Sequence, residues 1–130
     1  MDYNDKRKQV QNKTFHSSLH YAIIGLKTAI MEEKNMKRHL IVSVMVILLG
    51  LICRLSLHDW LWLFLSIFLV IVSEIFNTSM ENLVDLVTHY EYHPIAKKVK
   101  DMMAGAVLLM SFLAVIIGLF IFIPAFLKLF

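Results

Sequence analysis

The amino-acid sequence predicts an all-α integral membrane protein with three transmembrane helices preceded by an N-terminal amphipathic surface helix. Of its 130 residues, 58% are hydrophobic and only 18% are charged, whereas soluble domains have roughly 45–50% apolar and about 25% charged residues. The mean hydropathy is +0.68. Three apolar stretches also approach the roughly 20 residues that a helix needs to cross a bilayer core of about 30 Å. These observations disfavour a soluble fold.

The chain is expected to contain one domain. Residues 1–13 are expected to form a disordered basic N-terminus, and residues 14–130 a single membrane domain without linkers or repeats. The N-terminal segment lacks the apolar core and cleavage site of a signal peptide. The one cysteine, Cys53, lies in an apolar run and is expected to serve packing.

A surface helix is predicted over residues 14–34, because apolar residues recur there at spacings of three or four. The stripe consists of Phe15, Leu19, Ile23, Leu26 and Ile30, which is typical of one face of an amphipathic helix. Two compatible interpretations stay open: the helix lies flat on the cytoplasmic membrane surface, or it packs on the spans as a structural cap.

The three spans are predicted at about 38–57, 60–87 and 101–127. The first carries a single charge near its end, at Arg54, whose long side chain can reach the headgroups. The second is apolar from Trp60 to Val72 and then becomes polar along one side. The third is the clearest, because residues 102–127 contain no charged side chain.

The positions of lysine and arginine predict the orientation. Eight of these residues precede His39, three lie in the connection around Lys98, and the outer loop contributes only Arg54. By the positive-inside rule, the N-terminus and the connection at about 88–101 lie in the cytoplasm, and the C-terminus lies outside. No nucleic-acid partner is expected, because the basic residues are not interleaved with aromatic residues on a soluble face.

A polar stripe on the second span is the main functional signal. Glu74, Asn77, Glu81 and Asp85 are spaced by three, four and four residues, which places them within an arc of about 80° on a helix. Each ionisable group in hydrocarbon costs about 2.5–3.5 kcal/mol on insertion scales, so such residues are functional candidates.

The depth of the stripe indicates different tasks for its two glutamates. Glu74 lies 14 residues beyond Trp60, or about 21 Å at 1.5 Å per residue, which leaves about 9 Å to the cytoplasmic boundary. A carboxylate at that depth suits a general base. Glu81 lies nearer to water and suits Mg²⁺, with Glu32 or Glu33 as a second ligand.

Basic residues next to the stripe add the cations that phosphate binding needs. Lys97, Lys98 and Lys100 lie in the cytoplasmic connection, beside Asp101. A base, a metal site and phosphate-binding cations are the recurring parts of phosphoryl transfer. The four glycines do not form a P-loop or another glycine-rich phosphate loop.

Two other functions remain open for the stripe. Its side chains could form an interhelical polar network that directs assembly, or the acids could line the ion path of an oligomeric channel or transporter subunit. A pore is expected to be polar along its whole length, whereas the outer halves of these spans are nearly free of polar residues.

The stripe also carries a recognisable motif. Residues 74–85 read EIFNTSMENLVD, which resembles the signature of the prokaryotic diacylglycerol kinase family, with Phe76 as one departure. A second similarity is KDMMAGAV from Lys100, and the loop Glu91-Tyr92-His93 between the two resembles the nucleotide-contacting loop of that family. The similarity extends over nearly the whole chain after about Thr14.

The resemblance implies a bacterial membrane enzyme that phosphorylates a lipid alcohol with ATP and Mg²⁺, so that residues 14–130 form a membrane kinase domain. It implies a homotrimer with active sites shared between chains. The implied roles are Glu74 as catalytic base; Glu33 and Glu81 as metal ligands; Tyr21, Glu33, Glu81, Glu91, Tyr92, His93, Lys100 and Asp101 as nucleotide contacts; and Asn77 and Asp85 in support.

One position bears on the choice of lipid. Six residues after Glu33, where members that prefer diacylglycerol carry an acid, this chain has His39. The pattern from Glu33 to His39 is similar to the Gram-positive undecaprenol kinase branch. The resemblance therefore implies undecaprenol as substrate, with diacylglycerol as the alternative.

Overall fold

The computed structural model describes residues 15–128 and shows four helices and no strand in that range. The helices are α2 (Phe15–Glu32), α3 (Lys34–Ile52), α4 (Leu57–Thr88) and α5 (Pro94–Leu127). The prediction of an all-α protein with an N-terminal helix before three long apolar ones is confirmed. The basic segment at 1–13 lies outside the described residues.

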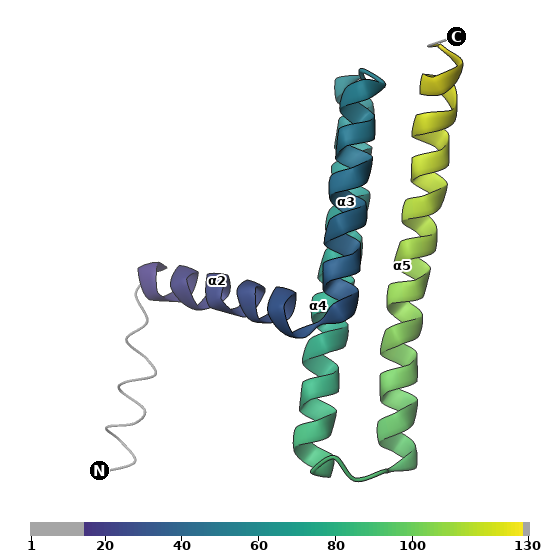
Figure 1. Ribbon diagram of the computed structural model, residues 1–130. Coiled ribbons are helices and arrows are strands. Elements are labelled where there is room, and N and C mark those ends of the chain that lie inside the picture. Colours follow the sequence, from purple (N-terminus) through teal and green to yellow (C-terminus); the bar gives the residue numbers. More distant parts are fainter. Residues whose placement is uncertain (1–14, 129–130) are drawn as a thin grey trace.

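The three long helices run alongside one another, and α2 projects from them near the start of α3 (Figure 1). The most extensive packing joins α4 to α5, and α3 packs mainly on α4. Because α2 makes fewer contacts with the rest of the protein, the structure consists of a helical bundle with a side arm.

All three long helices are apolar enough to cross a membrane, and two of them are longer than a crossing requires. The 32 residues of α4 and the 34 residues of α5 correspond to about 48 and 51 Å at 1.5 Å per residue, against a bilayer core of about 30 Å. α5 begins at Pro94 rather than near 101. The ends of α4 and α5 that flank the hairpin therefore continue as polar helical segments beyond the hydrocarbon core.

Local sequence signals explain where the helices begin and end. α4 starts with a capping box in which Ser56 accepts a hydrogen bond from the backbone of Asp59 at 3.2 Å, and the Asp59 carboxylate accepts one from the backbone of Ser56 at 3.3 Å. α4 ends where His89 adopts a left-handed conformation, with φ of 52°. His93 caps α5, and Pro94 occupies its first turn, where a missing N–H has no cost.

The chain changes direction between α2 and α3 at a single extended residue. Glu33 has φ of −98° and ψ of 123°, and it occupies the N-cap position of α3. The apolar stripe of α2 remains largely uncovered by protein, with Phe15 84% and Ile23 57% exposed. This exposed apolar stripe is compatible with the predicted location on a membrane surface, and the contacts of α2 with α3 and α4 are compatible with a cap on the spans.

The C-terminal end of α3 meets the N-terminal end of α4 at a glycine. Gly50 is buried, and a Cβ atom at this position would lie 2.9 Å from Cη2 of Trp60 and 3.0 Å from Cδ1 of Leu55. The Trp60 ring stacks on Phe64, with centroids 5.4 Å apart. Gly50 therefore allows the indole ring to lie directly against α3.

We predict that Gly50→Ala lowers the thermal unfolding midpoint of the purified protein in detergent. Overpacking typically costs about 1–3 kcal/mol, while alanine recovers up to about 1 kcal/mol of helix propensity. The matched control is Gly25→Ala in α2, where a Cβ meets no atom within 4 Å, so its midpoint should not fall. Equal midpoints for the two variants would contradict the close packing of Trp60.

Candidate active site

The C-terminal half of α4 contains buried polar side chains among apolar ones. Glu74 is only 1% exposed, and Asn77 and Thr78 are each 5% exposed. Burial of polar groups is unfavourable unless they are paired. In the described structure, Glu74 Oε1 and Asn77 Oδ1 are buried without a hydrogen-bond partner. Two acceptor oxygens at neighbouring turns of one helix are thus left available for a ligand.

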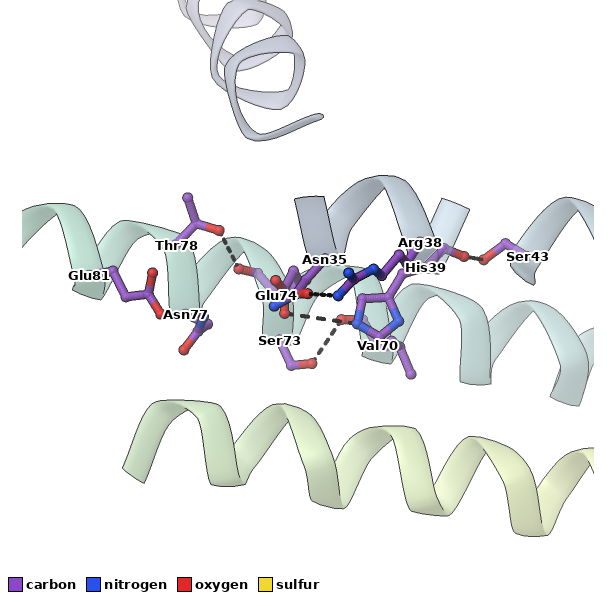
Figure 2. Close-up of polar contacts among 10 residues, drawn as sticks. All are labelled: Asn35, Arg38, His39, Ser43, Val70, Ser73, Glu74, Asn77, Thr78 and Glu81. Atoms are coloured by element: carbon purple, nitrogen blue, oxygen red, sulfur yellow. Dashed lines mark hydrogen bonds and ion pairs between the residues drawn. The ribbon is translucent and has the colours of Figure 1, made fainter. Parts of the chain in front are cut away.

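Glu74 faces α3, where it meets His39. Nε2 of His39 lies 3.9 Å from Oε2 of Glu74 (Figure 2). On the same helix, the Thr78 hydroxyl donates to the backbone carbonyl of Glu74 at 3.0 Å, so Thr78 contributes to the helix rather than to the carboxylate. The carboxylate therefore has one oxygen near His39 and one without a partner.

One turn farther along α4, Asn77 and Glu81 are joined by a hydrogen bond. Asn77 Nδ2 donates to Glu81 Oε1 at 3.1 Å (Figure 2). Because Asn77 is buried and fixed by packing, this bond orients the more exposed Glu81 side chain. Glu33 at the start of α3 and Glu81 both interact electrostatically with Glu74. Each of these two glutamates is therefore close enough to Glu74 for their charges to interact.

The donor set is compatible with Mg²⁺. No three His, Cys, Asp or Glu side chains within residues 15–128 are grouped to hold a metal ion. Magnesium, however, usually takes one or two protein carboxylates and completes its octahedral shell with water and substrate phosphates. Glu33 and Glu81 supply two carboxylates, and the unpartnered Oδ1 of Asn77 lies beside Glu81. The residues therefore fit a magnesium ion that is completed by a phosphate ligand.

A polar cavity of about 440 Å³ lies at the hairpin between α4 and α5, within the range typical of small-molecule sites. Lys100 Nζ on α5 pairs with Asp85 Oδ1 on α4 at 2.5 Å, and Lys97 pairs with Asp101 one turn away. Five residues predicted to contact nucleotide line this cavity together with Asp85, namely Glu91, Tyr92, His93, Lys100 and Asp101.

The structure separates the predicted residues into two groups. Glu74 and Asp85 are eleven residues apart on one helix, which corresponds to about 16 Å, and Glu81 lies between them. The remaining residue, Tyr21, is on α2, is 57% exposed and does not line the hairpin cavity. Within one chain, therefore, the glutamates and the hairpin cavity are connected along α4, and Tyr21 is not among the residues that line the cavity.

An apolar groove leads away from the glutamate cluster between the three long helices. It encloses about 250 Å³, and His39 lines it together with Val70 and Val42. Two of its serines add little polarity, because Ser43 and Ser66 donate to the carbonyls of His39 and Leu63 in their own helices, at 2.7 and 2.8 Å. The groove suits a hydrocarbon chain whose end lies beside His39, the residue that faces Glu74.

The contact between His39 and Glu74 was not predicted from the sequence, where His39 served only to distinguish related branches. A histidine near the start of a span is a weak signal, because the relative register of α3 and α4 cannot be read from hydrophobic periodicity. The Asp85–Lys100 pair was also not predicted. Asp85 lies three residues before the end of α4 and Lys100 six residues after the start of α5, so the signal that could have indicated their pairing is their opposite charge on the two sides of the turn.

The family model for prokaryotic diacylglycerol kinase matches residues 20–122. Undecaprenol kinase of Bacillus subtilis is 37% identical over 124 residues, which cover 95% of this chain and 98% of that protein. Diacylglycerol kinase of Synechocystis sp. is 37% identical over 112 residues, covering 86% of this chain and 64% of that protein. Diacylglycerol kinase of Helicobacter pylori is 37% identical over 97 residues, covering 75% of each chain.

Proposed function

This chain belongs to the prokaryotic diacylglycerol kinase family and is a multi-pass membrane lipid kinase, and we propose that it phosphorylates undecaprenol with ATP to give undecaprenyl phosphate. The observation that carries the proposal is the position of Glu74: one oxygen of its buried carboxylate, Oε1, has no partner, and the other, Oε2, lies 3.9 Å from Nε2 of His39, which lines the apolar groove. Such a carboxylate can contact a lipid alcohol on one side and a polyphosphate on the other.

Glu74 acts as the general base in this proposal. A base must lie within hydrogen-bond reach of the proton that it removes, and Oε1 is free to accept one from the lipid hydroxyl. The hydroxyl proton passes to Oε1 while the alcohol oxygen bonds to the γ-phosphorus. The bond between that phosphorus and the βγ-bridging oxygen breaks, and ADP leaves with the electron pair.

Glu33 and Glu81 would hold Mg²⁺, and both would also lie beside the bound nucleotide. When bound, the ion supplies charge neutralisation for the phosphate oxygens. Asn77 supports this site because its amide fixes one oxygen of Glu81 at 3.1 Å. Since Glu81 lies between Glu74 and the hairpin cavity on α4, phosphates bound at Glu81 can extend toward the base.

The hairpin cavity binds the rest of ATP. Glu91, Tyr92 and His93 come from the turn, and Lys100 and Asp101 from the first turns of α5. The Lys100 ammonium is the cation that faces α4, where Asp85 holds it at 2.5 Å. Asp85 therefore supports the site by positioning a phosphate-binding cation.

A homotrimer with shared active sites accounts best for Tyr21, the remaining proposed nucleotide contact. Tyr21 lies on the projecting helix α2, away from the hairpin cavity of its own chain (Figure 1). An arm that projects from one chain can reach a site of a neighbouring chain in a closed ring, as symmetric assemblies allow.

The proposed site lies on the cytoplasmic side of the membrane, where ATP is available. Eleven of the thirteen lysines and arginines lie before His39 or in the α4–α5 connection, as the positive-inside rule requires of cytoplasmic segments. The N-terminus is then cytoplasmic, and the C-terminus, at the other end of α5, lies outside. The channel alternative gains no support, because no polar path lines the groove toward its outer end at Phe122.

Undecaprenol is proposed over diacylglycerol because the undecaprenol kinase of Bacillus subtilis aligns with 95% of this chain, against 86% and 75% for the two diacylglycerol kinases. Identity alone does not separate them, since it is 37% in each case. The groove fits this choice, since three helices line it with small residues such as Ala114 and Gly118, which leave width for a branched isoprenoid.

Incubation of the purified protein with radiolabelled ATP, Mg²⁺ and equal amounts of undecaprenol or dioleoylglycerol tests the proposal. We predict labelled lipid from both mixtures or from undecaprenol alone, with the higher kcat/KM for undecaprenol. A higher kcat/KM for dioleoylglycerol would overturn the choice of substrate. Absence of labelled lipid from both would overturn the kinase assignment itself.

Glu74→Gln is predicted to lower kcat by at least about 100-fold, the scale of general base catalysis, while the Kd for a non-hydrolysable ATP analogue changes little. The amide keeps the size of the side chain but cannot accept the proton. Ser79→Ala serves as a control on the same helix, because the Ser79 hydroxyl donates only to the carbonyl of Ile75. If Glu74→Gln lost nucleotide affinity and kcat together, Glu74 would be a nucleotide ligand rather than the base.

A further inference from the structure

The two oxygens of the Glu74 carboxylate have different surroundings. Oε2 lies 3.9 Å from Nε2 of His39, whereas Oε1 is buried and has no partner within the described residues. A glutamate side chain has three rotatable bonds, and the last of them is only weakly restricted. A group that holds one carboxylate oxygen therefore also fixes the direction in which the other oxygen points toward the substrate.

His39 is the basic side chain of the α3 N-terminal region that faces this carboxylate. Its neighbour Arg38 forms no ion pair with Glu74 among residues 15–128, and its guanidinium donates to Asn35 Oδ1 at 3.0 Å (Figure 2). Lys37 is exposed, and none of the ion pairs found among residues 15–128 joins it to Glu74. His39 is half-buried, with 26% of its side chain exposed.

His39 also lines the inner end of the apolar groove, opposite Val70. Val70 lies one turn from Glu74 on α4. The imidazole of His39 thus lies between the apolar side chains of the groove and the Glu74 carboxylate. A lipid alcohol whose chain occupied the groove would bring its hydroxyl to the same place.

We propose that His39 is a positioning residue for the lipid kinase reaction: its Nε2–H holds Oε2 of Glu74, so that Oε1 points at the substrate hydroxyl. This inference rests on the proposed function, because it assigns the base to Glu74. The distance of 3.9 Å exceeds a hydrogen bond, and contacts of this kind often shorten only when substrate is bound. His39 itself takes no proton from the substrate.

Two substitutions of similar size test this role. His39→Gln keeps an N–H donor near the position of Nε2, and His39→Leu removes it. We expect His39→Leu to lower kcat by about 10–100-fold, the usual effect of losing an orienting partner, with the KM for ATP unchanged. His39→Gln should retain most of kcat. A merely structural role of the ring would affect both variants alike.

His58 offers a matched control at the opposite end of α4, where its Nε2 accepts a hydrogen bond from Trp62 Nε1 at 3.0 Å. His58→Gln and His58→Leu should have the same kcat as the unmodified protein. A drop in kcat for His58→Leu as large as that for His39→Leu would show a general effect of losing a histidine, and it would overturn the proposal.

A measurement without turnover covers the case in which His39→Leu does not assemble. In protein labelled with ¹⁵N-histidine, the ring nitrogens of His39 should shift when Glu74 is changed to Gln, while those of His58 stay in place. Unchanged His39 signals would overturn the proposal. So would equal kcat for His39→Gln and His39→Leu in an active preparation, whereas absence of lipid phosphorylation by the unmodified protein would instead refute the proposed function.

Discussion

The structure depends on the burial of one carboxylate, that of Glu74, among apolar side chains. Glu74 is 1% exposed in a helix that is otherwise apolar over most of its length, and a lone charge there costs several kcal/mol. The surroundings reduce this cost on one side only: His39 faces Oε2, and Oε1 has no partner. A carboxylate held on one side with a free oxygen on the other can accept a proton from a substrate, which is the role proposed for Glu74.

α4 is long enough to extend from Glu74, the proposed base, to the water outside the bilayer. A helix of 32 residues, or about 48 Å, is longer than the hydrocarbon core is thick, and it extends as far as the hairpin. Asn77 orients Glu81 in the middle of this path, and Asp85 fixes Lys100 near its end. One helix thus spans the distance between a substrate dissolved in lipid and a cosubstrate dissolved in water, and α5 contributes the cations along the same axis.

The sequence predicted the helices well, because hydrophobic length and the spacing of Glu74, Asn77, Glu81 and Asp85 are properties of single helices. The site that these residues form stays a prediction, supported by the burial of Glu74 and Asn77. Contacts between helices could not be predicted. The meeting of His39 with Glu74 depends on the register of α3 against α4, which Gly50 and Trp60 help to set through close packing at the far end.

The account requires the α4–α5 hairpin to face the compartment that contains ATP. Cysteine labelling tests this most directly, in a Cys53→Ala background that removes the single native thiol. Tyr90 in the hairpin and Leu57 at the start of α4 are 86% and 88% exposed. In intact cells, an impermeant maleimide should label Leu57→Cys, and it should label Tyr90→Cys only after the membrane is opened. Labelling of Tyr90→Cys from outside would contradict the account, because Glu74 and Glu81 would then lie near the surface that ATP does not reach.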